Sequence, residues 1–215
     1  MHARSWTTRA AVSVAALALT SSLTGTATAA TVVRTAPAAQ RTSTAVPAVG
    51  DVDYATWQRD VSAVVATARP YIEQRTANSS GQRLAMVLDI DNTSLETDFH
   101  HFWEYPTPAV KQVLDLAKYA DSRGVDIFFV TARPGIIEPL TSYNLRKAGY
   151  PLDGLYVRSL PDLFSEVSAY KTGKRAEIEA KGYTIVANIG NSTTDLVGGH
   201  AERTFKLPDY DGQLS

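Results

Sequence analysis

The sequence lacks cysteine, which excludes disulfide bonds and any lipid anchor that is attached through a cysteine. It also lacks an excess of charge of one sign. With 21 basic residues against 22 acidic ones, no basic surface indicates a nucleic-acid partner. Beyond residue 30, no apolar run reaches the roughly 18 residues that cross a membrane. The chain therefore depends on an apolar core, which its 44% hydrophobic content can supply.

The first residues have the pattern of an export signal. Arg4 and Arg9 give a positive start without acidic residues, and the mostly apolar stretch 10–19 follows. Residues 27–29 read Ala-Thr-Ala, a cleavage motif of small residues. We expect a signal peptide over residues 1–29, export of the protein into the extracellular space, and no stable membrane insertion after cleavage. A buried N-terminal helix is the alternative, but bulky core residues are scarce here.

A second compositional change follows the predicted cleavage point. Residues 30–50 are rich in alanine, threonine, proline and valine, and they contain no acidic residue. Such a segment has too little apolar surface in a regular pattern to form a core. The sequence thus predicts a disordered linker over residues 30–50 and one domain over residues 51–215.

Within this domain, apolar residues first follow a helical period and then alternate between strand and helix patterns. A first helix is expected to open at Asp51 or Asp53 and to run to about Asn78, and Pro70 should kink or break it. The alternation that follows predicts the α/β class: a Rossmann-like open parallel sheet with helices on both faces, plus the N-terminal helical extension. Strands are expected at 84–88, 125–130, 155–157, 184–189 and 204–207, and helices at 108–122, 136–147 and 174–181. Ligands of such sheets bind beyond the carboxyl ends of the strands.

Two carboxylates follow the first predicted strand, in Asp89-Ile90-Asp91-Asn92-Thr93. An Asp-rich turn would explain them structurally, but a charge at the end of an apolar strand is costly. A carboxylate can attack phosphorus, and we predict this role for Asp89. Asp91 can protonate the leaving group and later activate water. A divalent cation would screen the charge between carboxylate and phosphate, and magnesium suits such oxygen ligands.

The second predicted strand ends at Thr131. Its hydroxyl could bind a phosphate oxygen, or its β-branched side chain could simply pack. For Arg133, we expect pairing with a surface acid rather than contact with a substrate.

Lys171 lies just before a predicted helix, where a cation opposes the helix dipole. A role in binding the phosphoryl group therefore explains Lys171 better than helix stabilisation does. Lys174, Arg175 and Lys181 are expected on a solvated helix face.

The fourth predicted strand is followed by the polar loop Gly190-Asn191-Ser192-Thr193-Thr194-Asp195. Ser192 or Thr193 could cap a short helix. Asn191 can offer an amide oxygen and Asp195 a carboxylate oxygen to a metal. Capping and metal binding are compatible.

Taken together, these segments resemble the four motifs of the haloacid dehalogenase (HAD) superfamily, and they occur in the right order. Asp89-x-Asp91-x-Thr93, Thr131, Lys171 and Gly190-Asn191-x-x-x-Asp195 carry the resemblance. The chain is similar in particular to acid phosphatases of the class B, plant acid phosphatase and vegetative storage protein type. The segments 144–150, 170–175, 182–185 and 205–208 support this closer resemblance.

The resemblance implies a magnesium-dependent phosphatase that acts on small phosphomonoesters. It implies Mg²⁺ bound by Asp89, Asp195, Asn191 and the backbone carbonyl of Asp91. One residue departs from the family pattern: Asn191 stands where an aspartate is usual, and a neutral ligand should weaken magnesium binding. The sequence thus predicts a secreted acid phosphatase with an aspartyl-phosphate intermediate. The alternative is a weakly active or inactive secreted binding or storage protein on the same fold.

The segment 98–105 is rich in aromatic residues and follows the first motif. It could roof the site and stack on an aromatic leaving group. Equally, its aromatic side chains could anchor the loop to the N-terminal helix.

Overall fold

The computed structural model describes residues 49–214. The predicted signal peptide and residues 30–48 of the predicted linker lie outside this range. Val49 and Val52 exchange backbone hydrogen bonds of 3.3 and 2.9 Å, so the described contacts include a residue of the predicted linker. None of the helices in the described range combines the length and apolar character that crossing a bilayer requires.

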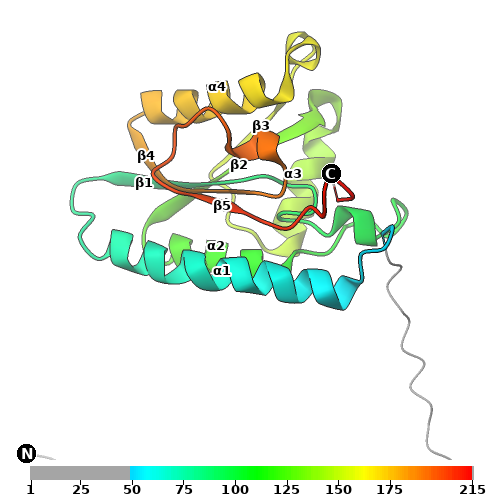
Figure 1. Ribbon diagram of the computed structural model, residues 1–215. Helices are drawn as coiled ribbons and strands as arrows, with labels where there is room; N and C mark the ends of the chain where they lie inside the picture. Colours follow the sequence, from blue (N-terminus) through cyan, green and yellow to red (C-terminus); the bar gives the residue numbers. More distant parts are fainter. Residues whose placement is uncertain (1–48, 215) are drawn as a thin grey trace, which may run out of the picture. The chain divides into compact units, whose positions relative to one another are not determined.

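A five-stranded parallel sheet forms the centre of the domain, in the order β3-β2-β1-β4-β5 (Figure 1). This arrangement confirms the predicted open parallel sheet. β1 lies in the middle, and the chain first builds outward on one side of it and then on the other, so loops after β1 and β4 diverge at a natural ligand site. The strands are β1 (Arg83–Leu88), β2 (Val125–Pro134), β3 (Gly154–Arg158), β4 (Tyr183–Gly190) and β5 (Thr204–Lys206).

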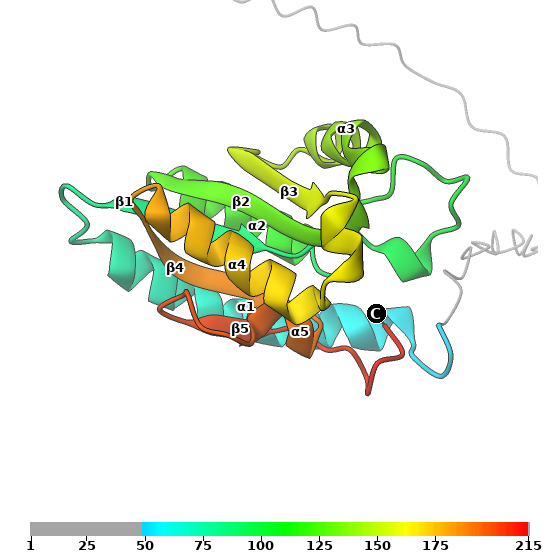
Figure 2. The ribbon, with the colours of Figure 1, turned by 90° about the horizontal axis from the view of Figure 1, so that it is seen from above.

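Helices cover both faces of the sheet, as predicted. α1 and α2 lie on one face, and α4 lies on the other (Figures 1 and 2). α2 begins at residue 111, three residues later than predicted, because residues 108–110 are extended. The helices are α1 (Tyr54–Thr76), α2 (Lys111–Asp121), α3 (Glu138–Ala148), α4 (Val167–Ala180) and α5 (Thr193–Leu196), with short 3-10 turns at 97–99, 135–137 and 161–164.

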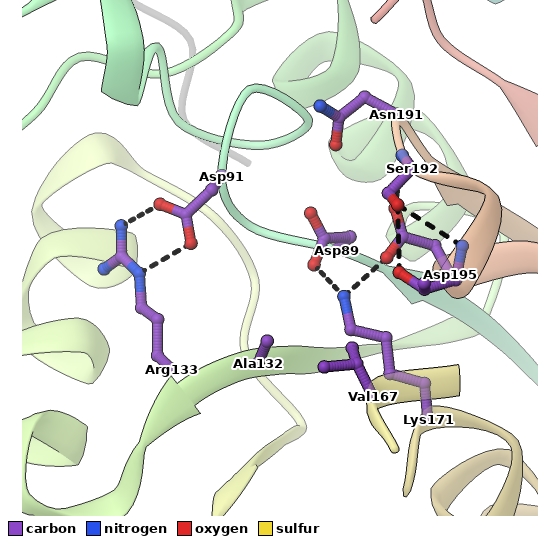
Figure 3. A pocket seen from close by; sticks show the side chains of 10 residues that line it. Asp89, Asp91, Ala132, Arg133, Val167, Lys171, Asn191, Ser192 and Asp195 are labelled. Carbon is purple, nitrogen blue, oxygen red and sulfur yellow. Dashed lines mark hydrogen bonds and ion pairs between the residues drawn. The ribbon is translucent and has the colours of Figure 1, made fainter. Parts of the chain in front are cut away.

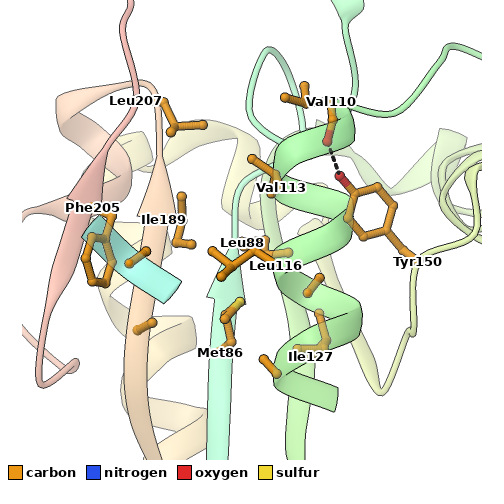
Figure 4. Packing of buried hydrophobic residues seen from close by; sticks show 14 of the residues in the cluster. Met86, Leu88, Val110, Val113, Leu116, Ile127, Tyr150, Ile189, Phe205 and Leu207 are labelled. Carbon is orange, nitrogen blue, oxygen red and sulfur yellow. Dashed lines mark hydrogen bonds between the residues drawn. The ribbon is translucent and has the colours of Figure 1, made fainter. Parts of the chain in front are cut away.

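The side chains of β1 alternate between two apolar cores. Leu84, Met86 and Leu88 point into the larger core under α1 and α2, whereas Ala85 and Val87 point into the smaller core under α4. The larger core is shown in Figure 4. Burial on both faces explains why β1 reads as one continuous apolar run. It also fixes where the strand ends and where Asp89 emerges.

Of the two outcomes expected at Pro70, a kink or a break of the first helix, the break is wrong. α1 continues through Pro70 for six more residues. Asp53 caps its start by accepting a 2.9 Å hydrogen bond from the Thr56 amide. Trp57 on one side of the proline and Ile72 on the other are fully buried. Packing along the whole length of the helix outweighs the one backbone hydrogen bond that proline removes.

The predicted start of α4 is also wrong. The helix begins at Val167, seven residues before the predicted position, and its N-cap Glu166 makes no side-chain capping bond. A start signal of the usual kind is therefore missing from the sequence. Lys171 lies in the second turn of α4, where the helix dipole has little effect. Its role must be judged from its contacts instead.

The aromatic segment divides between the two predicted possibilities. Phe99 is buried, stacks on Trp57 with 4.5 Å between ring centroids and meets Tyr54 edge-on at 5.2 Å, so it anchors the segment to α1. Phe102 and Trp103 are exposed. One ring thus holds the loop in place, and the following rings remain on the surface.

Candidate active site

A cavity of about 410 Å³ opens at the carboxyl ends of β1, β2 and β4 (Figure 3). Five of the predicted site residues line it, although they lie up to 106 positions apart in the sequence. They are Asp89, Asp91, Lys171, Asn191 and Asp195. Ala132 and Arg133 contribute from β2. The four sequence segments therefore converge on one pocket.

Lys171 joins two buried carboxylates at the centre of this pocket. Its Nζ donates to Asp89 Oδ1 at 2.6 Å and to Asp195 Oδ1 at 2.5 Å. All three side chains are at most 8% exposed. We refer to Asp89, Lys171 and Asp195 as the buried triad. Removing either type of partner would leave an uncompensated buried charge.

The buried triad contains two carboxylates and only one ammonium group. Burial raises the pKa of the Asp89 carboxyl to about 7; Lys171 opposes this change and Asp195 adds to it. Burial lowers the pKa of Lys171, but the attraction of Asp89 and Asp195 outweighs it, and the pKa is raised. Both shifts express the same excess of negative charge in a place with little water. A second cation would balance it.

Close packing at the end of β4 holds Asp195. A side chain at Gly190 would bring its Cβ to 2.3 Å from Asp195 Cβ, so only glycine fits. Ser192 caps α5, as predicted, and its amide donates to Asp195 Oδ2 at 2.8 Å. The capping arrangement and the ion pair with Lys171 thus use different oxygens of one carboxylate.

The prediction that Arg175 lies on a solvated helix face is wrong. Arg175 is 1% exposed and reaches across to the α5 loop. Its guanidinium donates to the backbone oxygens of Asp195 at 2.7 Å and Gly199 at 3.0 Å, and also to that of Val197. Arg175 lies four residues after Lys171, one helical turn along α4. One face of this helix therefore holds both the carboxylate and the backbone of Asp195.

The expectation for Arg133 is wrong in its choice of partner. Arg133 pairs with Asp91 in the pocket and not with a surface acid. Its Nη2 donates to Asp91 Oδ1 at 2.6 Å and its Nε donates to Oδ2 at 3.0 Å. The Thr97 hydroxyl donates to Oδ1 at 2.8 Å. A planar guanidinium matches both oxygens of a carboxylate, so Asp91 is held in one direction, away from the buried triad (Figure 3).

Asp91 and Asp89 have opposite pKa shifts. Burial raises the pKa of Asp91, but the hydrogen bonds and charge of Arg133, with a contribution from Thr97, leave it below its ordinary value. Asp91 has its own full cationic partner, whereas Asp89 shares Lys171 with Asp195. Two carboxylates two residues apart are thus suited to different work.

Asn191 is buried and its amide group is oriented from both sides. Its Oδ1 accepts from the Thr93 hydroxyl at 3.1 Å, and its Nδ2 donates to the backbone oxygen of Leu214 at 2.7 Å. The Asn191 backbone amide also donates to Thr93 Oγ1 at 3.0 Å. An aspartate here would place an acceptor against the Leu214 carbonyl. The local contacts therefore account for the asparagine at this position.

Thr131 differs from the other predicted residues, because it does not line the cavity. It is fully buried in β2, and its hydroxyl accepts a 3.2 Å hydrogen bond from the Arg133 amide. A phosphate-binding role for Thr131 stays a prediction.

The oxygens around the pocket fit a magnesium ion by their chemistry. Carboxylates of Asp89 and Asp195 and the amide oxygen of Asn191 are hard donors of the kind that Mg²⁺ prefers. The excess negative charge of the buried triad points the same way. Within residues 49–214, however, no three His, Cys, Asp or Glu side chains form a ready metal cluster. A cation here would have to draw on the amide and backbone oxygens as well.

Comparison with curated proteins finds partial similarity to plant proteins. The stem 28 kDa glycoprotein of Glycine max is 37% identical over 106 residues, which cover 47% of this chain and 42% of that protein. Acid phosphatase 1 of Solanum lycopersicum is 31% identical over 104 residues, covering 47% and 41%. Vegetative storage protein 1 of Arabidopsis thaliana is 30% identical over 104 residues, covering 48% and 38%. The matched segment spans less than half the length of these relatives.

Among solved structures, the class C acid phosphatase from Bacillus anthracis has the same fold. The TM-score is 0.58 at 18% identity, with 73% of this chain and 79% of that chain covered. The family model described as "HAD superfamily, subfamily IIIB (Acid phosphatase)" matches residues 4–213, which is nearly the whole sequence. The resemblance inferred from the four motifs is thereby confirmed, and the chain belongs to subfamily IIIB, the acid phosphatases, of the HAD superfamily.

Proposed function

We propose that this protein is a magnesium-dependent hydrolase of small phosphomonoesters that works through an aspartyl-phosphate on Asp89. One observation carries the proposal. A buried carboxylate at the end of the central strand shares a lysine with a second carboxylate, and a separately paired carboxylate lies two residues further on. Family membership supports the same reaction.

In the first step, a carboxylate oxygen of Asp89 attacks the phosphorus atom. A bond from Asp89 to phosphorus forms, and the bond from phosphorus to the leaving-group oxygen breaks. Lys171, already within 2.6 Å of Asp89, stabilises the negative charge that the phosphoryl group carries during transfer.

Asp91 moves the protons. In the first step it gives a proton to the leaving-group oxygen, which departs as an alcohol. In the second step it takes a proton from water, whose oxygen attacks the phosphorus and restores the Asp89 carboxylate. A bound phosphate dianion raises the pKa of a neighbouring carboxyl, which favours the protonated form of Asp91 needed first. Arg133 and Thr97 keep its carboxyl directed to one side of Asp89.

Asp89, Asp195, Asn191 and the Asp91 backbone carbonyl would hold the Mg²⁺. When bound, the ion screens the repulsion between the nucleophile and the phosphate oxygens. It also supplies the positive charge that the buried triad lacks.

The direct test is the Asp89→Asn variant with p-nitrophenyl phosphate and saturating magnesium. We expect turnover by the wild type to require magnesium. Turnover by the variant should be lower by at least about a thousandfold, because the nucleophile is gone. Asp115→Asn is the matched control, since Asp115 is exposed on α2 and pairs at the surface with Lys111. Wild-type turnover by the Asp89→Asn protein would disprove this assignment.

A storage or binding role is the second candidate. Relatives include proteins named vegetative storage protein and stem glycoprotein, and Asn191 departs from the usual aspartate. This candidate predicts no turnover on a broad panel of phosphomonoesters at saturating magnesium. Detectable phosphate release by the wild type, lost in Asp89→Asn, would rule it out.

Export of the protein is part of the proposal. The mature chain would start at Ala30, after the predicted signal peptide, and the domain would follow the linker. N-terminal sequencing of the protein recovered outside the cell tests the cleavage point. A first residue of Met1 on that protein would contradict it.

A further inference from the structure

A second cavity of about 290 Å³ adjoins the pocket, and we refer to it as the side cavity. Arg133 lines both cavities. Thr97 lines the side cavity and also donates to the Asp91 carboxylate. An acid that protonates a leaving group must contact the leaving-group oxygen. The part of the substrate beyond that oxygen therefore extends from Asp91 toward Thr97 and into the side cavity.

Asn144 and His100, two of the polar side chains that line the side cavity, are already paired inside the protein. Asn144 accepts from the Thr107 amide at 3.0 Å and donates to the Thr107 carbonyl at 2.8 Å. The two ring nitrogens of His100 face Glu96 and Glu104, each at 3.2 Å. The hydrogen bonds of Asn144 and His100 therefore connect parts of the cavity wall to one another.

Four further residues give the side cavity an apolar wall. Phe102, Ile137, Leu140 and the ring of Tyr105 provide it, and the Tyr105 hydroxyl donates to the Leu140 carbonyl at 2.6 Å. Phe102 is 89% exposed and Leu140 is 58% exposed, so both have apolar surface to cover. α3 and the segment after β1 lie next to each other at the same end of the domain (Figure 2).

Resting on the proposed function, we infer that the side cavity binds the leaving group and selects phosphomonoesters of aliphatic alcohols over those of polyhydroxylated ones. A hydroxyl group that enters the side cavity gives up its water and meets few free partners, which costs binding energy. A methylene group gains about fourfold in affinity when it is fully buried. The preference for aliphatic leaving groups arises because polar side chains of the cavity are hydrogen-bonded within the protein, whereas apolar side chains such as Phe102 and Leu140 are exposed.

A neighbouring apolar groove serves as a comparison. It is lined by residues 134–136 with Arg158, Ser159, Leu160 and Leu163, and it shares no lining residue with the pocket. Leu160 there is 78% exposed. Because this groove shares no lining residue with the pocket or with the side cavity, it is assigned no part in leaving-group binding.

Alkylphosphonates test the inference without turnover, because their carbon–phosphorus bond is not hydrolysed by this reaction. Binding of ethyl-, propyl-, butyl- and hexylphosphonate to the mature protein with magnesium can be measured by calorimetry. The 2,3-dihydroxypropylphosphonate is the hydroxylated comparison for the propyl compound. We expect affinity to rise by about fourfold for each methylene that enters the side cavity, and the dihydroxy compound to bind at least tenfold more weakly than propylphosphonate.

Two surface variants locate the effect. Leu140→Asn should flatten the chain-length series, whereas Leu160→Asn should leave it as in the wild type. Thermal melting of both proteins checks that the fold is kept. A flat series in the wild type, or equal flattening in the two variants, would overturn the inference.

The result is separable from that of the proposed function. A steep series together with absent turnover would contradict the hydrolase and keep the apolar subsite. Turnover of p-nitrophenyl phosphate together with a flat series would keep the hydrolase and reject the subsite.

Discussion

The buried triad and the Asp91–Arg133 pair lie in one pocket, yet they differ in burial and in charge balance. The triad is nearly closed to solvent and has more negative than positive groups, whereas Asp91 is 31% exposed and has a cation of its own. The pKa of Asp89 is raised and that of Asp91 is lowered. Environment, and not residue type, thus gives two aspartates of one pocket opposite pKa shifts, as their different proposed roles require.

Breaking the triad should have the largest effect. In Lys171→Gln, two buried carboxylates face each other without a cation, which costs about 3–5 kcal/mol of unfolding free energy and at least a hundredfold in kcat. Urea unfolding with and without magnesium measures the loss of unfolding free energy. Magnesium should restore part of the stability, because the ion replaces the missing charge.

Lys174→Gln is the control for this comparison. Lys174 lies on the same helix and pairs at the surface with Glu177. Its loss should cost less than about 1 kcal/mol. Equal destabilisation by Lys171→Gln and Lys174→Gln would show that the ion pairs of the buried triad contribute no more to stability than a surface pair on the same helix.

Breaking the second pair should have a smaller effect, and one that depends on the leaving group. Arg133→Gln releases Asp91 from its fixed direction, and we expect kcat to fall about 10- to 100-fold with butyl phosphate. p-Nitrophenyl phosphate should lose less, because its leaving group needs little protonation. Arg133→Lys keeps the positive charge but cannot bind both oxygens of Asp91 as a guanidinium does. Its kcat should therefore lie between those of the wild type and Arg133→Gln. Equal losses on both substrates would contradict a positioning role for Arg133.

The opposite pKa shifts predict opposite pH dependence of stability in the metal-free protein. The contribution of Asp89 is fully present below its unfolded pKa and is lost as pH rises through about 7. The contribution of Asp91 is present above its unfolded pKa and is lost as pH falls through its lowered folded value.

Unfolding free energies of Asp89→Asn and Asp91→Asn in EDTA, measured from pH 3 to 8, test these signs. Relative to the wild type, Asp89→Asn should gain stability as pH rises from 4 to 8. Asp91→Asn should lose relative stability as pH rises from 3 to 5. The same sign for both variants would refute the comparison.

The smallest expected effect concerns Asn191. Asn191→Asp adds a charged ligand, so the magnesium midpoint should fall severalfold. The same change removes the donor to the Leu214 carbonyl and should cost about 1–3 kcal/mol of stability without magnesium. Magnesium titration measures the midpoint, and urea unfolding measures the loss of stability. An unchanged midpoint would remove Asn191 from the metal ligands.

Local patterns in the sequence are sufficient to predict the α/β class, the order of the elements and the four polar segments. Continuous apolar runs identify buried parallel strands, and in such sheets the residues after the strands meet at one edge. For this reason the strand pattern predicts Asp89 and Asp195 at one site, whereas Lys171 is added by the resemblance to the family motifs. The start of α4 is not predictable in the same way, because no capping residue marks it.

By itself, the sequence determined the fold class and the residue types that chemistry requires, because both follow from periodicity and from side-chain groups within short segments. Only the tertiary structure decided which groups pair. Arg133 meets Asp91 across 42 positions, and Asn191 meets Leu214 across 23. Arg175 is buried beside the site although its neighbours Lys174 and Lys181 remain near the surface. Such contacts depend on how the elements pack in space, and no local pattern encodes that.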